Sequence, residues 1–77
     1  MNSKILANVL GKLRKEDKFS LAYILDAINY KGRKNFVAFG DSYKKKELLD
    51  MLMEAVSDDY YLQRLLKLNS YKDCKEE

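Results

Sequence analysis

Apolar side chains recur at helical spacing through most of this 77-residue chain. The first stretch places Ile5, Leu6, Val9, Leu10 and Leu13 on one stripe of a helix, because residues three or four positions apart share a face. A chain this short has room for one hydrophobic core, so its helices must pack together in a single domain. The pattern predicts a mainly α fold of about four helices, at residues 3–16, 20–30, 42–56 and 58–69.

Residues that cap helices precede each of these stretches. Ser3 and Ser20 stand before the first two, and Asp41 with Ser42 stands before the third. Ser57 precedes the fourth, and two aspartates follow it in what becomes the first turn. Side-chain oxygens of Ser and Asp accept hydrogen bonds from the free N–H groups at a helix start, so these positions predict where the helices begin.

The segment 33–40 is the least regular part of the pattern. Its "NFVAF" run resembles a strand, and a lone strand would leave its backbone groups unpaired. An alternative fold is therefore α+β, with a β-hairpin formed by residues 21–30 and 34–40. Strict alternation of apolar and polar residues is poor in 21–30, which favours a helix there and a short extended or irregular segment at 33–40.

The domain is expected to span residues 1–69, and the polar run 70–77, "SYKDCKEE", is expected to be a disordered tail. The tail carries Cys74, the only cysteine of the chain, so no intramolecular disulfide can form. Apolar residues cover more than half the circumference of the 43–56 stretch, which suggests a homodimer through that helix. The longest uninterrupted apolar run, residues 21–25, is far too short to cross a bilayer, so a soluble, intracellular, cytoplasmic protein is expected.

The composition argues against most catalytic chemistry. With no histidine and one cysteine, the chain can supply neither a Ser-His or Cys-His nucleophile nor a zinc site. Its three glycines are scattered, whereas loops that cradle phosphates need several glycines close together. We therefore expect a protein that is not an enzyme and uses no metal or cofactor.

Charge is unevenly distributed along the chain. The segment 31–46 has six cations against one acid, a net charge of +5, whereas residues 47–77 carry −4. Three successive lysines, Lys44, Lys45 and Lys46, fall at the start of the third predicted helix, where the helix dipole favours acids. A helix start of this kind suits a phosphate or a carboxylate, although a run of lysines is also compatible with an ordinary solvated surface.

Two tyrosines lie close to these cations in the sequence. Tyr23 and Tyr30 are seven residues apart, on the side of the second predicted helix opposite its apolar face, and there they would be exposed for stacking. The candidate binding residues are Lys31, Arg33, Lys34, Lys44, Lys45, Lys46, Tyr23 and Tyr30.

These features suggest a small regulatory protein that binds nucleic acid through the 31–46 surface. Lysine outnumbers arginine there, so contacts to the phosphate backbone are expected rather than readout of bases. The alternative is a protein-interaction module, such as a phage- or mobile-element-type inhibitor or adaptor of a host protein. Its partner would present an acidic surface to the same lysines.

Overall fold

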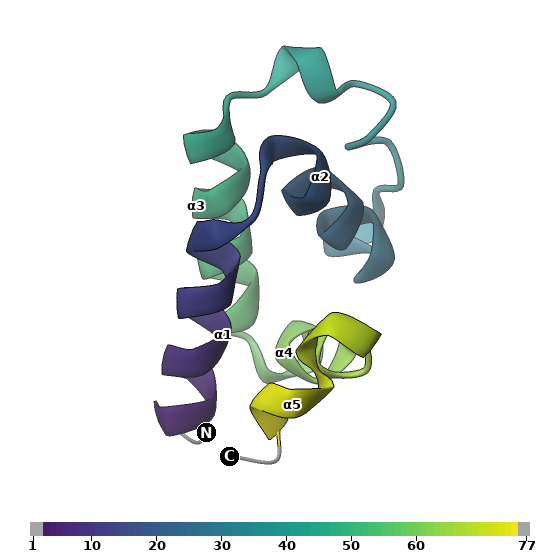
Figure 1. The fold of residues 1–77 in the computed structure, drawn as a ribbon. Helices are drawn as coiled ribbons and strands as arrows, with labels where there is room; N and C mark the ends of the chain where they lie inside the picture. Colours follow the sequence, from purple (N-terminus) through teal and green to yellow (C-terminus); the bar gives the residue numbers. More distant parts are fainter. Residues whose placement is uncertain (1–2, 76–77) are drawn as a thin grey trace.

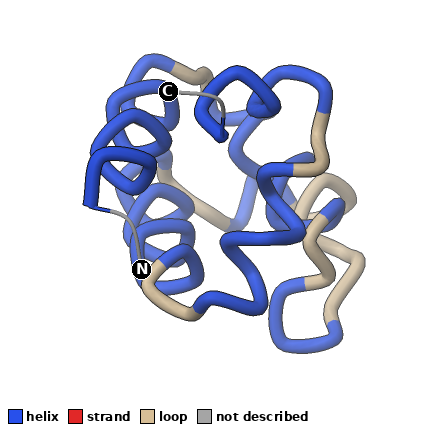
Figure 2. The backbone as a smooth tube through the Cα atoms, turned by 90° about the horizontal axis from the view of Figure 1, so that it is seen from below, coloured by secondary structure: helices blue, strands red, loops and turns tan. Residues whose placement is uncertain are grey.

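The computed structural model, which describes residues 3–75, confirms a small helical domain (Figure 1). The helices are α1 (Ser3–Lys15), α2 (Lys18–Ala27), α3 (Lys45–Val56), α4 (Asp59–Leu66) and α5 (Lys72–Lys75), with short 3₁₀ turns η1 (Tyr30–Gly32), η2 (Gly40–Ser42) and η3 (Asn69–Tyr71). Over the described residues the backbone is helix and loop without a strand, so the alternative β-hairpin is not formed (Figure 2). The radius of gyration, 11.5 Å, equals the value of about 11.5 Å that the size scaling gives for a compact chain of this length.

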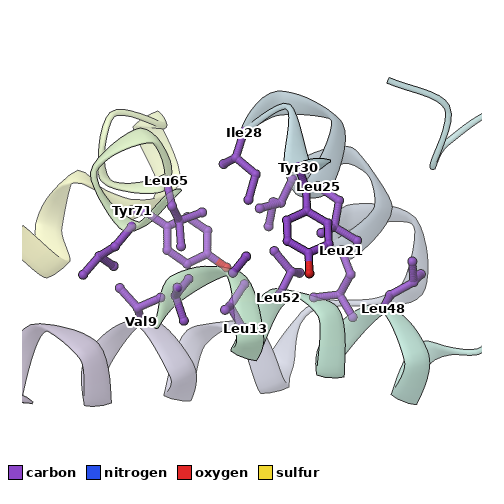
Figure 3. Close-up of a cluster of buried hydrophobic side chains, with 14 of the residues drawn as sticks. Val9, Leu13, Leu21, Leu25, Ile28, Tyr30, Leu48, Leu52, Leu65 and Tyr71 are labelled. Carbon is purple, nitrogen blue, oxygen red and sulfur yellow. The ribbon is translucent and has the colours of Figure 1, made fainter. Parts of the chain in front are cut away.

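The helix α3 lies at the centre of the packing. It runs antiparallel to α1, and α2 and α4 also contact it (Figure 1). Side chains from α1, α2, α3 and α4 meet in one core, together with Tyr30 and Tyr71 from the 3₁₀ turns (Figure 3). Within residues 3–75, none of the helices combines the length and the apolarity that crossing a bilayer requires.

The wide apolar face of α3 packs against other helices of the same chain. Leu48, Leu52, Ala55 and Val56 are buried against the three neighbouring helices, and Leu49 is half-buried against the same core. The observation that suggested a homodimer through residues 43–56 is thus explained without a second copy.

The second helix begins earlier than predicted. Its cap is Asp17 rather than Ser20, because the Asp17 Oδ1 atom accepts a hydrogen bond of 2.7 Å from the backbone N–H of Ser20. This bond, together with the nearby charge of Lys45, lowers the pKa of the Asp17 carboxyl group below its usual value. The helix therefore starts at Lys18 and includes Phe19 on its surface.

The starts of α3 and α4 are also set by acids. The Glu47 carboxylate accepts a 2.8 Å hydrogen bond from the N–H of Lys44, so α3 starts at Lys45 and not at residue 42. The cap of α4 is Asp58, which accepts from the Tyr60 N–H at 2.9 Å, and not the preceding Ser57. In each case a carboxylate satisfies a free N–H group at the helix start.

The irregular conformation predicted for residues 33–40 is confirmed, and one carboxylate explains it. Asp26, at the end of α2, accepts hydrogen bonds from the backbone N–H groups of Phe36 at 2.9 Å and Val37 at 3.0 Å. The Phe36 side chain is fully buried in the core. Because Asp26 pairs these N–H groups, the "NFVAF" run needs no partner strand.

The segment from residue 70 onward differs from the predicted disordered tail. Within the described residues, Tyr71 and Cys74 are buried in the core, and residues 72–75 form α5. The Tyr71 hydroxyl donates to the Glu16 carboxylate at 3.2 Å, and the Lys12 ammonium group bonds to the carbonyl oxygen of Ser70. The polar composition of the segment gives no sign of these two contacts, because their partners lie more than fifty positions earlier in the sequence. Residues 76 and 77, the end of the predicted tail, lie outside the described part of the chain.

Candidate functional site

The two candidate tyrosines occupy opposite environments. Asn29 has a left-handed backbone (φ 55°), so the chain leaves the line of α2 before Tyr30. The Tyr30 ring consequently turns inward, is 3% exposed and packs against the rings of Phe36 and Tyr61. Tyr30 is therefore no stacking surface, whereas Tyr23 is 59% exposed as predicted from its position on α2.

The first three candidate cations lie in η1 and just after it. The backbone N–H of Lys31 donates to the Tyr61 hydroxyl at 2.9 Å, and its ammonium group lies 5.2 Å from the centre of the Tyr30 ring. Arg33 and Lys34 follow as exposed residues. These contacts place Lys31 against α4.

The other three cations are exposed at the start of α3. Lys45 lies close enough to Asp17 to lower its pKa, so one of the three lysines faces an acid. The start of α3 and the segment 31–34 lie on different sides of the domain, with η2 between them along the chain (Figure 1). The structure therefore does not bring the six cations of 31–46 together into one surface.

A different surface stands out on α2. Phe19 is 66% exposed, and it lies one helical turn before Tyr23, on the same face. Phe19 was not among the candidate residues predicted from the sequence, because the predicted helix starts after it. Asp17 is as good a cap former as Ser20, and with Asp17 as the cap Phe19 falls on the helix.

A groove of about 630 Å³ lies beside these aromatic rings, between α2 and the chain that follows α4. Its lining combines an apolar wall with a few polar groups: Glu16, Phe19, Ser20, Tyr23, Ile24, Lys67, Leu68, Asn69, Ser70 and Tyr71. A second groove of about 300 Å³ lies on the other side of Phe19, lined by Lys18, Ala22, Val37, Ala38, Gly40 and Asp41. Phe19 thus forms a ridge between two hollows.

The acid of the larger groove is already paired. The Glu16 carboxylate accepts from the Tyr71 hydroxyl, and burial together with the charge of Glu16 raises the pKa of Tyr71 above its ordinary value. The Lys12 ammonium group lies 4.8 Å from the centre of the Tyr71 ring. Within residues 3–75, the ammonium groups of Lys18 and Lys67 make no hydrogen bond or ion pair, so they remain available to an incoming group.

The lining of the larger groove combines side chains suited to binding. The groove offers aromatic and aliphatic contact with one lysine, Lys67, and one acid, Glu16, in its lining, which contains no cysteine or histidine. Among the described residues, no three metal-ligating side chains gather where they could hold an ion. No family model matches the chain, and no match to it was found among curated proteins or solved structures.

Proposed function

We propose that this chain is a protein-interaction module whose partner docks on the outer face of α2. The observation that supports this is the pairing of two exposed aromatic side chains, Phe19 and Tyr23, with an open groove that they border. Large apolar side chains gain free energy when they leave water, and a contiguous exposed group of them is typical of interaction surfaces. The module would act as an adaptor or inhibitor, without chemistry of its own.

The alternative through the 31–46 segment has less support. Its tyrosine beside the cations, Tyr30, is buried, and the cations are divided between two places in the fold. Phe39 is the exposed aromatic side chain of this segment, whereas α2 presents two, Phe19 and Tyr23, one helical turn apart and beside a groove.

A double substitution tests the proposal. Phe19→Ala with Tyr23→Ala removes the ridge, and Tyr60→Ala is the matched control, because Tyr60 is 60% exposed and lines neither groove. Each tagged protein is used to capture proteins from nuclease-treated lysate of the source cells, and the captured proteins are quantified by mass spectrometry. We expect a partner that wild type and Tyr60→Ala retain and the double variant loses. A captured set that is the same for all three proteins would contradict the proposal.

Nucleic-acid binding is a second candidate, favoured by the three exposed lysines at the start of α3. Fluorescence anisotropy of labelled duplex DNA, single-stranded DNA and RNA measures it, at low and at physiological salt. Three phosphate contacts would make the logarithm of the affinity fall with a slope of about −2.7 against the logarithm of salt concentration. Charge reversal of Lys44, Lys45 and Lys46 should abolish this binding, whereas reversal of Lys31, Arg33 and Lys34 should change it little. Absence of binding at low salt would remove this candidate.

A further inference from the structure

We infer that a second copy of this chain covers the outer face of α2 when no other partner is bound. This inference rests on the proposed function, because it concerns the same face and names what occupies it before a partner docks. It follows from the shape of the face, from the balance of charges in its two grooves and from its size.

The shape of the face is complementary to itself. Phe19 stands between the two grooves with 66% of its surface exposed, and Tyr23, 59% exposed, borders the larger groove. A two-fold axis along this ridge, midway between the ridge and the larger groove, would place the ridge of each copy in the larger groove of the other. Such a contact satisfies both copies at once, as in most homodimers.

The larger groove can receive the ridge. Its volume of about 630 Å³ is within the range of cavities that enclose whole small molecules, so it has room for the two aromatic rings. Across the groove from α2 lies Leu68, which is half-buried within one chain. Each incoming ring would therefore meet aliphatic surface that a single chain leaves partly in water, and both surfaces gain free energy on contact.

The charges in the two grooves are balanced. The larger groove is lined by one cation and one acid, Lys67 and Glu16, and the smaller one by Lys18 and Asp41. Such a face does not repel its own copy, because each cation can approach an acid of the other chain. The 31–46 segment, with a net charge of +5, would instead repel a second copy of itself.

The size of the face fits a dimer that separates readily. Ten residues line the larger groove and seven line the smaller, with Phe19 in both, so the two grooves involve sixteen residues. A standard stable interface uses about 20–30 residues a side, and smaller ones are typical of transient complexes. Transient dimerisation would cover the aromatic rings and still leave the face accessible to a partner that binds more tightly.

Sedimentation velocity of the full chain over a range of concentrations tests the inference. We expect a reversible dimer with a micromolar dissociation constant. The constant should rise at least about tenfold when Phe19→Ala is combined with Tyr23→Ala, because these rings form the contact. It should stay within about twofold in the control Tyr60→Ala, an exposed ring that lines neither groove. Circular dichroism confirms that each variant is folded.

Charge variants test which face makes the contact. Lys18→Glu combined with Lys67→Glu makes the two grooves acidic, and Asp41→Lys makes them basic. At low salt each variant alone should dimerise at least about threefold more weakly than wild type, because like charges then face each other. An equimolar mixture of the two should recover the association of wild type. Weakening without recovery, or no weakening, would overturn the inference.

The remaining outcomes separate the inference from the proposed function. A chain that is monomeric at all concentrations, with capture from lysate that still requires Phe19 and Tyr23, would assign the face to a different protein and overturn the inference alone. A dimer that survives loss of both rings would also overturn it. A dimer lost with both rings, with capture of every other protein unchanged, would support the inference and contradict the proposed function.

Discussion

Two irregular segments, one between α2 and α3 and one after α4, are attached to the core in different ways. Each buries one aromatic side chain completely or nearly so: Phe36 in the connector, residues 29–43, and Tyr71 in the C-terminal segment, residues 69–75. Each also meets a carboxylate near an end of a helix. Asp26 binds the backbone of the connector itself, whereas Glu16 binds only the side-chain hydroxyl of Tyr71.

The difference shows two ways to hold a chain that has no regular hydrogen bonding. In the connector, a carboxylate ten residues away replaces the partner strand that two N–H groups would otherwise need. In the C-terminal segment, a buried ring supplies most of the attachment. Two polar contacts are added: the Tyr71 hydroxyl donates to Glu16, and Lys12 of α1 bonds to the Ser70 carbonyl oxygen. The first attachment should depend on charge and the second on packing.

The largest effect is expected from removing either aromatic ring. Phe36→Ala and Tyr71→Ala should each lower the free energy of unfolding by about 3–5 kcal/mol, because each leaves a cavity in the core. Urea unfolding followed by circular dichroism measures this change. A loss below about 1 kcal/mol for one of them would show that its segment is not part of the cooperative core.

A smaller loss is expected when the charge of the connector's carboxylate is removed. Asp26→Asn should lower the free energy of unfolding by about 2 kcal/mol, since the amide has one acceptor oxygen where the carboxylate uses two. The same urea experiment applies, with Asp41→Asn as control for an exposed acid of the same connector. Equal effects of the two substitutions would argue against a special role for Asp26.

The corresponding polar contact of the C-terminal segment should contribute less. Tyr71→Phe keeps the ring and should cost about 1.5 kcal/mol, because it removes a bond to a charged acceptor at the long distance of 3.2 Å. Since the folded-state pKa of Tyr71 is raised, its contribution is complete below the ordinary pKa of 10.0 and is lost as the pH rises through the raised value.

The pH dependence provides the control for that variant. Wild-type stability should fall above about pH 10, and this fall should be smaller in Tyr71→Phe than in the exposed control Tyr60→Phe. Stability curves at several alkaline pH values, by urea unfolding, measure it. Identical curves for wild type and Tyr71→Phe would show that burial does not hinder the ionisation of the Tyr71 hydroxyl.

The smallest effect is expected from a third tyrosine, and it has the opposite sign. The Tyr30 hydroxyl is buried without a hydrogen-bond partner among the described residues, unlike the Tyr71 hydroxyl. Tyr30→Phe should therefore raise the free energy of unfolding by about 1 kcal/mol, because an unpaired buried hydroxyl is costly. Urea unfolding that shows a loss instead would mean that this hydroxyl does have a partner in solution.

The same contrast explains what could be predicted from the sequence. The spacing of apolar residues was sufficient to predict α1, α3 and α4 as helices. The apolar face of a helix depends only on residues within a few positions of one another, so the local sequence reveals it. The predicted start of the second helix is two residues late, because Asp17 and not Ser20 is the cap. The candidate site failed at Tyr30 because one left-handed residue, Asn29, turned it from the surface into the core.

The burial of Tyr71 was beyond such reasoning for a different reason. Its partner Glu16 lies 55 positions earlier, and nothing in "SYKDCKEE" distinguishes a buried tyrosine from a solvated one. The groove beside α2 was hidden in the same way, since it needs residues around Leu68 to complete it. Contacts between distant parts of the chain depend on the packing of whole helices, which local patterns do not describe.

The contact between α1 and residues 70–71 also affects the order of folding. Closing a loop of more than fifty residues carries a larger entropy cost than joining neighbouring helices, so α2, α3 and α4 can assemble before this contact forms. During synthesis, α1 leaves the ribosome long before Tyr71, and the groove beside Phe19 has no opposite wall until then. A nascent chain should therefore be unable to hold a partner in this groove until its residues around 68–71 have been synthesised and folded.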